Sequence, residues 1–552
     1  MDWSDEEDAL LETDVESSND SDNESHIDNG AWRAWRTGDS DLPKYPFTVP
    51  NPGVHFLQPL HQELDALQHF LTDELLEEFV CATNAFAIIK LSGKKFTNHS
   101  IWYKWQDVTL PEMKAYLGVI LNMAINDKPD VKTYFSRSWT EFCPFFVEVF
   151  SRRRFLQIHW MFHLKAPQPS THPITRRSKV QNFITYLQEK CLNLYTPQQN
   201  LAVDESTVGY KGRILFKTYN PQKPTKWGIR IYVLSECDTG YICSFEPYFG
   251  KLTTDALPWP DQLFTTRIVL HLVDQVAAKA QGSGYHVYTD RFYTNMPLAR
   301  KLQDRQMHLT GTVQKSRKNL PEEVKRLRLK DHEKKVFRHP DNLMTLCWKD
   351  KRLILMLSTW HNGETEACVR RVRGGRREEV EKPRGGRREE VEKPIVISDY
   401  TQHMGAVDRA DHYCASYSFT RKTLRWWRKL FFWLLEVCIV NSFILYKKET
   451  GQQEIRHLEY RKKVIVQLVG TIRSSTAKKR GRPSSGDEHE RLRKVPHFIA
   501  NAGSGHNKAC MVCSKRQQRK TTVFYCETCS RKPGLHPGKC FKDYHTKQDY
   551  HQ

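Results

Sequence analysis

Two Cys-x-x-Cys pairs near the carboxyl end constrain this chain more than any other feature. Cys510 and Cys513 form the first pair, and Cys526 and Cys529 form the second pair twelve residues later. Three further candidate ligands follow them: His536, Cys540 and His545. Closely spaced thiolates and imidazoles are the ligands that tetrahedral Zn²⁺ takes in proteins. So short a segment cannot bury enough apolar surface to fold alone, so we expect metal to organise it.

The number of ligands indicates two zinc ions. Seven ligands exceed the needs of one four-coordinate ion, and an eighth completes a second site. His497 is the best candidate for the eighth ligand, and His506 is the alternative. The other nine of the fourteen cysteines are scattered singly. This usage predicts a reducing compartment and not a disulfide framework.

The charge distribution indicates a polyanionic partner. The formal net charge is +21, although the first 30 residues hold twelve acidic side chains and no Lys or Arg. A basic body of this kind suits nucleic acid, and a basic ribosome-associated or merely soluble protein is the alternative. Residues 1–45 are rich in Ser, Asp, Glu and Asn, so we predict a disordered tail.

The sequence lacks the pattern of a secretory leader and of a membrane-spanning helix. The amino terminus lacks the positive and apolar regions of a secretory leader. The most apolar stretch, 430–445, is short and is interrupted by polar side chains. We therefore predict a buried helix there and no membrane partner.

The middle of the chain changes from a helical to a β-rich pattern. Apolar residues recur at helical spacing in 55–197, which includes a possible capping box formed by Thr109 and Glu112. From 198 to 315 the pattern predicts strands at 229–234, 241–245, 286–289 and 309–313, with a helix at 297–303. A strand meander followed by a crossover helix is what an α/β nuclease core requires.

A perfect tandem repeat lies in the region 316–395. Arg373–Pro383 reads RGGRREEVEKP, and Arg384–Pro394 repeats it without change. This composition predicts an exposed flexible loop with no chemistry of its own. Helices resume at 396–470, followed by a basic linker at 471–495 and the Cys/His-rich segment 496–552.

Four aspartates are candidate metal ligands. Asp204 and Asp290 each follow a short apolar or β-rich run, and we expect each to stand at the end of its strand. Asp408 and Asp411 are spaced to share one face of a helix. Carboxylate oxygens are the ligands of Mg²⁺ or Mn²⁺, and two such ions can promote phosphodiester cleavage. Taken singly, each aspartate reads more simply as a turn or cap residue.

The blocks around these acids resemble the piggyBac transposase family. The matching blocks are 201–207, 210–213, 223–228, 289–299, 408–411, 421–426 and 441–446, and the resemblance covers about 55–470 and the Cys/His tail. It implies an α/β fold with an RNase H-like core and a catalytic triad of Asp204, Asp290 and Asp408, with Asp411 at a further acidic position. It also implies an insertion domain between the second and third acids, flanking α-helical dimerisation and DNA-binding regions, and a cross-brace zinc domain that recognises the transposon ends.

Basic and aromatic residues beside the acids are candidate DNA contacts. Phosphate neutralisation is predicted for two clusters: Lys211, Arg213, Lys217, Lys223 and Lys226, then Arg421, Lys422, Arg425, Arg428 and Lys429. Trp426 and Trp427 are candidates for stacking on a displaced base, with packing in the core as the simpler alternative for either one. Arg480 and Arg482 lie in a run resembling an AT-hook, which also reads as a nuclear localisation signal. A plain basic linker is the alternative for that run.

The function implied is that of a cut-and-paste DNA transposase. By family resemblance it would excise and integrate at TTAA targets with Mg²⁺ or Mn²⁺. The expected partners are double-stranded DNA, namely the terminal inverted repeats and the target, and a second copy of the chain. The alternatives are a domesticated, non-catalytic DNA-binding protein and a nuclease with another substrate.

Overall fold

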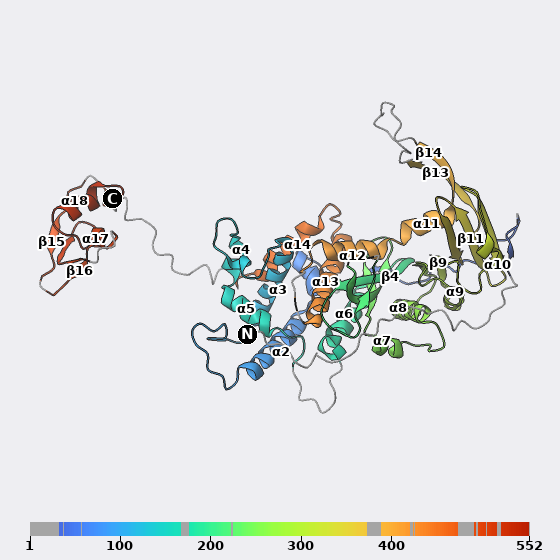
Figure 1. Ribbon diagram of the computed structural model, residues 1–552, viewed down its shortest axis with the longest axis horizontal. Coiled ribbons are helices and arrows are strands. Elements are labelled where there is room, and N and C mark those ends of the chain that lie inside the picture. Colours follow the sequence, from blue (N-terminus) through green and yellow to red (C-terminus); the bar gives the residue numbers. More distant parts are fainter. Residues whose placement is uncertain are drawn as a thin grey trace. The chain divides into compact units, whose positions relative to one another are not determined.

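A mixed β-sheet is the central element of the larger part of the chain (Figure 1). The computed structural model describes residues 32–166, 176–371, 388–419, 423–472 and 491–550. Within these ranges, positions 37, 57, 222, 224, 424, 493–494, 504 and 516–519 are not described. The chain divides into two compact units, Met1–Arg473 and Ser474–Gln552. The ten-stranded sheet belongs to the first unit, so the candidate catalytic acids and the Cys/His segment lie in different units.

The central part of the sheet has the strand order β7-β6-β4-β8-β9. The strands are β4 (Asn200–Gly209), β6 (Trp227–Glu236), β7 (Ile242–Pro247), β8 (His286–Thr289) and β9 (His308–Thr312). β4, β6 and β7 pair antiparallel, whereas β8 is parallel to β4 and β9 is parallel to β8. Three antiparallel strands followed by two parallel ones are the arrangement expected of the RNase H-like core.

Two helices make the crossovers that the parallel strands need. α8 (Phe264–Ala280) connects β7 to β8, and α9 (Met296–Gln303) connects β8 to β9. Short elements complete this region: β5 (Thr218–Tyr219), which pairs with β6, and α7 (Lys251–Ala256). The predicted strands and the helix at 297–303 are confirmed to within a few residues.

The first part of the predicted insertion belongs to the core sheet. β10 (Lys334–His339), β11 (Leu343–Lys349) and β12 (Leu353–Ser358) form an antiparallel meander, which α10 (Glu322–Arg326) precedes. β12 pairs antiparallel with β9, so the meander extends the core sheet. The far edge is capped by β1 (Arg33–Ala34), which pairs with β10. The prediction of disorder over residues 1–45 is therefore wrong for the part from residue 32 onward, where Leu42 is also buried. Residues 1–31 lie outside the described residues.

The second copy of the tandem repeat is partly folded. Its residues Arg388–Pro394 form β14, which pairs antiparallel with β13 (Thr365–Arg371). Val391 is buried in a small cluster with Leu346 and Met356. The prediction of a loop is thus wrong for this half, because an alternating stretch of the repeat has an apolar residue to bury. The first copy lies outside the described residues.

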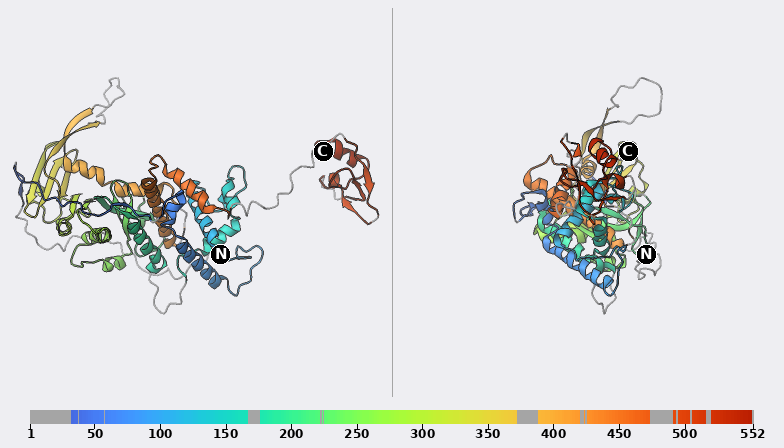
Figure 2. Two further views of the ribbon diagram at one scale, coloured as in Figure 1. Left: turned by 180° about the vertical axis from the view of Figure 1, so that it is seen from behind. Right: turned by 90° about the vertical axis from the view of Figure 1, so that its left-hand side faces the viewer.

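Most of the remaining helices lie on the side of the sheet away from the meander, whereas α11 (Ile395–His403) lies beside the meander and β14 (Figure 1). From the amino-terminal region come α1 (Glu63–Gln68), α2 (Asp73–Leu91), α3 (Leu110–Ile125), α4 (Pro144–Val149), α5 (Arg152–Met161) and α6 (Gln181–Leu194), with the small β2–β3 pair (Gly53–Val54 and Tyr195–Thr196). The later helices are α11 (Ile395–His403), α12 (Ala406–Ser416), α13 (Trp426–Thr450) and α14 (His457–Val469). The predicted capping box of Thr109 and Glu112 begins α3 as expected. α14 packs against α3, so the early and late helices form one layer (Figure 2).

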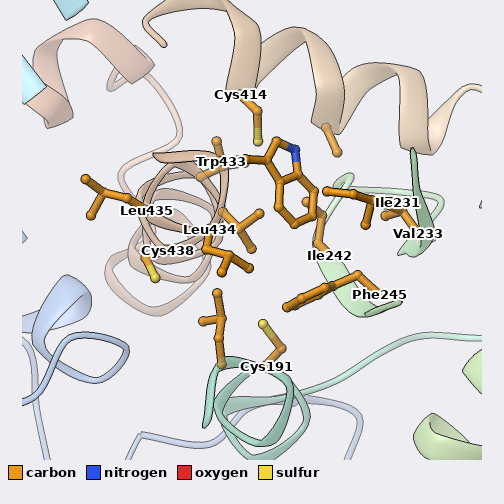
Figure 3. Packing of buried hydrophobic residues seen from close by; sticks show 14 of the residues in the cluster. Cys191, Ile231, Val233, Ile242, Phe245, Cys414, Trp433, Leu434, Leu435 and Cys438 are labelled. Atoms are coloured by element: carbon orange, nitrogen blue, oxygen red, sulfur yellow. The ribbon is translucent and has the colours of Figure 1, made fainter. Parts of the chain in front are cut away.

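Helix α13 is the central packing element of this unit. Figure 3 shows Trp433, Leu434 and Cys438 among apolar side chains of β6, β7, α6 and α12. Among the described helices, α13 alone has the length and hydropathy of a membrane span, and it is largely buried within the fold, as predicted for 430–445. Its Glu436 forms a buried bidentate ion pair with Arg461 of α14 at 2.6 and 2.8 Å, which fixes the two helices together.

The second unit is a small domain of short elements. It contains β15 (Ile499–Asn501), β16 (Lys508–Ala509), α17 (Met511–Lys515), β17 (Thr521–Thr522), β18 (Phe524–Cys526) and α18 (Lys539–Thr546). Its hydrophobic cluster contains few residues, and several of them are cysteines. This composition leaves little apolar burial to stabilise the domain without metal.

Candidate metal centres

Asp204 and Asp290 lie side by side on neighbouring parallel strands. The register pairs Val203 of β4 with Thr289 of β8, so the next residues along the two strands are the two acids. Asp290 immediately follows β8, as predicted. Asp204 does not end its strand: β4 continues to Gly209, because residues 205–209 remain paired with β6.

The other two acids come from α12, which packs against β4. Asp411 is partly buried and accepts a hydrogen bond from the side chain of Ser206, whereas Asp408 is exposed. Side chains two residues apart on a strand share a face, so Ser206 and Asp204 both lie on the side of β4 that meets α12. The predicted helical i, i+3 pair is present, and the structure places Asp411 deeper than Asp408.

Burial and neighbouring negative charge raise the pKa of three of these carboxyl groups. Burial, together with Glu205 and Asp290, raises the pKa of Asp204 to about 8. Burial likewise raises the pKa of Asp290, and it raises the pKa of Asp411 to about 6. Carboxylates that hinder one another's ionisation in a buried site are the groups that a divalent cation stabilises. The donor set therefore fits Mg²⁺ or Mn²⁺.

The acids are neighbours without converging on one point. Among the described residues, Asp204, Asp290 and Asp408 do not form a group whose ligand atoms all lie within 4.8 Å of one another. Of the residues around them, sequence reasoning missed Glu205 and Ser206. Because side chains two residues apart on a strand share a face, the position of Asp204 already indicated that Ser206 lies on the same side of the strand.

The predicted basic contacts are only partly described. Lys211, Arg213 and Lys226 are exposed near the end of β4 and the start of β6, where they are accessible to a ligand. Lys223 is partly buried, and its charge lowers the pKa of both Asp204 and Asp411. Lys223 is thus the basic residue that the structure brings to the carboxylates. Four other predicted contacts lie outside the described residues: Arg421, Lys422, Arg480 and Arg482.

Two predicted DNA contacts prove to be core residues in this structure. Trp426 is 2% exposed and packs edge-on against Phe216 and Phe249 at 5.1 and 5.9 Å between ring centroids. Base stacking by its indole is therefore wrong for this conformation, and the packing alternative holds. Arg428 is also buried, and it donates to the backbone carbonyl groups of His159 and Trp160. Arg425 is partly exposed and lies 3.5 Å from the Trp160 carbonyl oxygen.

Eight Cys and His side chains in the second unit form two four-ligand groups. The first contains His497, Cys526, Cys529 and His545, and the second contains Cys510, Cys513, His536 and Cys540. In the first, Cys529 Sγ lies 3.7 Å from His497 Nδ1 and 3.5 Å from His545 Nε2. In the second, Cys513 Sγ lies 3.7 Å from Cys540 Sγ. Tetrahedral zinc with ordinary bond lengths separates such ligands by about 3.5–3.8 Å.

The two groups interleave along the chain, which is a cross-brace. The first takes the outermost and the central ligands, and the second takes the pairs between them. His497, the candidate for the eighth ligand, lies with Cys526, Cys529 and His545 in the structure. The ring of His545 is oriented by its other nitrogen, 2.8 Å from the Phe541 carbonyl oxygen, and that of His536 by the Thr521 carbonyl oxygen at 3.2 Å. Such outer hydrogen bonds are typical of metal-binding histidines.

Two family models match the chain. One, described as Transposase IS4, matches residues 62–443, and the other, described as a DDE_Tnp_1-like zinc finger, matches residues 491–546. The human PiggyBac transposable element-derived protein 3 is 25% identical over 520 residues, which cover 93% of this chain and 81% of that protein. The human PiggyBac transposable element-derived protein 5 is 21% identical over 456 residues, which cover 80% of this chain and 82% of that protein.

A solved structure has the same fold. It is a piggyBac transposase synaptic complex with hairpin DNA, and it superimposes with a TM-score of 0.63 at 23% identity, covering 88% of this chain and 97% of the other. The first family model spans well over half of this chain and includes the strand β4 and the helix α12 that carry the acids. This chain therefore belongs to the piggyBac-type family of DDE transposases.

Proposed function

We propose that this chain is a metal-dependent DNA transposase that excises and integrates an element by cut-and-paste transposition. The observation that carries the proposal is the placement of Asp204 and Asp290 on adjacent parallel strands beside the acids of α12. Burial and neighbouring negative charge raise the pKa of Asp204 and of Asp290, and a divalent cation would stabilise their charged forms.

Asp204, Asp290 and Asp408 are the proposed ligands of Mg²⁺ or Mn²⁺. When bound, such ions supply an activated water and stabilise the leaving oxygen in phosphodiester cleavage. Asp411, held by Ser206, would keep α12 against β4 and contribute negative charge beside the ligands. Lys223 would stabilise the carboxylates as anions, because its charge lowers the pKa of Asp204 and Asp411.

DNA is the proposed substrate and partner. The exposed Lys211, Arg213 and Lys226 lie on the segment between β4 and β6, where they can neutralise phosphates beside the acids. The cross-brace domain is proposed to hold two Zn²⁺ and to bind the transposon ends. Arg480 and Arg482 are proposed for minor-groove contact and nuclear import, and a homodimer is proposed because two ends must be paired for coordinated cutting. Integration at TTAA targets is proposed from the family resemblance.

An excision assay tests the proposal in cells. A reporter gene interrupted by DNA that carries the cognate terminal repeats is restored only when the element is excised. The proposal predicts restoration by the wild type and none by Asp204→Asn at equal expression. With ends verified by direct binding, absence of excision by the wild type would establish the alternative, a DNA-binding protein that has lost catalysis.

A further inference from the structure

A second cluster of ionisable side chains lies in the first unit, apart from the four acids. His286 of β8, His361 after β12 and Asp399 of α11 place one ligand atom each within 4.8 Å of one another. The two histidines are buried, and Asp399 is partly buried. These residues come from three parts of the chain, including the strand that leads to Asp290 and the helix that precedes Asp408.

Hydrogen bonds join this cluster into a closed ring. Tyr288 donates to Asp399 Oδ2 at 2.7 Å, and its hydroxyl also lies 3.2 Å from His286 Nδ1. The Thr310 hydroxyl lies 2.8 Å from His286 Nε2 and 3.3 Å from His361 Nδ1. His361 Nε2 completes the ring, 3.2 Å from Asp399 Oδ2.

The other oxygen of Asp399 extends the ring along its own helix and to β4. His403 Nδ1 lies 3.1 Å from Asp399 Oδ1, and Asn200 Nδ2 lies 3.3 Å from His403 Nε2. Burial alone would raise the pKa of Asp399, but the hydrogen bonds from His361, His403 and Tyr288 outweigh it and hold the pKa below its ordinary value. Asp399 is therefore an anion surrounded by donors, and it ties α11 to β4, β8 and the segment after β12.

The ring explains the cluster without a metal ion. In the Cys/His unit the ligand sulfurs and nitrogens face one another directly. Here hydroxyl groups stand between the imidazoles, and both nitrogens of His286 and both of His361 already have a protein partner. Thr310 can donate to His286 Nε2 and Ser358 to His361 Nδ1, so the other nitrogen of each imidazole can donate, from His286 to the Tyr288 oxygen and from His361 to Asp399.

The ring lies close enough to α12 to fix its position. Only Met404 and Gly405 separate α11 from α12, whose first turn carries Asp408. Further along, α12 is held by Arg409, which donates to the carbonyl groups of Cys237 and Asp238 at 2.9 Å each. Because α12 is short, its orientation depends on such anchors at its amino-terminal end.

We propose that Asp399 is a positioning residue whose ring of hydrogen bonds fixes α11, and through it the carboxylates of α12, against the strands that bear Asp204 and Asp290. This inference rests on the proposed function, since it assigns a purpose to the placement of the acids. Asp399 does not itself touch DNA or metal. Its loss should weaken metal binding at the acids, because the ligands would no longer be held in one arrangement.

Mn²⁺ binding to the zinc-loaded full chain tests the inference without requiring activity. Bound Mn²⁺ is counted by electron paramagnetic resonance for the wild type, Asp399→Asn, Tyr288→Phe and the control Gln402→Ala, which changes an exposed residue of α11. Asp399→Asn should weaken Mn²⁺ binding by about 10- to 100-fold. Tyr288→Phe, which removes one donor at nearly constant volume, should give a smaller loss and carries the test if Asp399→Asn does not fold. Gln402→Ala should bind as the wild type does.

The outcomes separate this inference from the proposed function. Mn²⁺ binding that is abolished in Asp204→Asn but unchanged in both folded ring variants overturns the positioning role alone. A wild type that binds no Mn²⁺ overturns the proposed function and this inference with it. Zinc analysis adds a third result: three zinc ions per wild-type chain and two in Asp399→Asn would make Asp399 a metal ligand, which also overturns the positioning role.

Discussion

The carboxylate centre and the Cys/His unit are both built to hold cations, but they depend on them differently. In the Cys/His unit, eight ligands already stand at separations that tetrahedral zinc requires, around a very small hydrophobic cluster. In the first unit, the acids come from two strands of a ten-stranded sheet and from helix α12, beside an extensive core, and Asp204, Asp290 and Asp408 do not converge to within 4.8 Å.

This difference indicates which metal supports folding and which supports chemistry. A domain with little apolar burial gains its stability from the metal, so its ligands have one arrangement. A large core can instead tolerate carboxylates whose charges oppose one another, because the sheet and α13 supply the stability. Buried carboxylates with raised pKa values are typical of a catalytic centre that binds a cation.

The largest expected effect is on the Cys/His unit. Removing zinc with a chelator, or substituting Cys513→Ser, should unfold that unit, because structural zinc contributes about 10–16 kcal/mol to such domains at neutral pH. The first unit should remain folded. Hydrogen exchange of the full chain measures both units at once, with untreated protein as the control. If hydrogen-exchange protection were lost equally in both units, or in neither, the proposed difference in their dependence on zinc would be wrong.

The opposite result is expected from Asp204→Asn. The substitution removes a charged metal ligand at nearly constant volume, so strand cleavage should fall to background while zinc content and end binding stay at wild-type values. Gel-based cleavage of labelled end DNA and elemental analysis provide the two readouts. Loss of zinc in this variant would show that the two centres are not independent.

The pH dependence of stability should distinguish the acids further. The pKa of Asp204 is raised in the folded state from 3.8 to about 8. Between these values the folded state binds more protons than the unfolded state, so stability falls as pH rises. Without added divalent ions, the melting temperature of Asp204→Asn minus that of the wild type should therefore increase from pH 5 to pH 9. Parallel curves would mean that Asp204 is not buried as described.

The smallest effect is expected from the tandem repeat. Deleting Arg384–Pro394 leaves the same sequence as deleting the first copy, so Val380 can take the place of Val391 in β14. The connection between β13 and β14 becomes eleven residues shorter, which changes the closure entropy by only about 1 kcal/mol. Thermal unfolding should shift by a few degrees at most, and insoluble protein would show that the first copy is needed.

Much of the fold followed from local patterns. The strands at 286–289 and 241–245, the capping box of Thr109 and the buried helix around 430–445 all have periodicity or cap residues that act within a few positions. Seven of the eight residues in the two Cys/His groups stood out by their spacing, because a tetrahedral ion imposes it. His497 needed only a count to eight.

Long-range pairing could not be read in the same way. Nothing local marks β12 as a partner of β9, or Arg388–Pro394 as a strand instead of a loop, because partners distant in sequence decide both. Trp426 and Arg428 stand in a basic run that favours DNA contact, yet Phe216 and the end of α5 bury them. The ring around Asp399 was also missed, since it joins Asp399 to Tyr288, more than a hundred residues earlier in the chain.

Strand cleavage by the purified chain tests the central claim most directly. End DNA labelled at the transposon 3′ end is incubated with zinc-loaded protein in Mg²⁺ or Mn²⁺, beside Asp290→Asn, which should bind the DNA but leave it intact. The account predicts a nick at the 3′ end by the wild type, dependent on the divalent ion. Tight binding of verified ends with no cleavage by the wild type, or undiminished cleavage by Asp290→Asn, would contradict it.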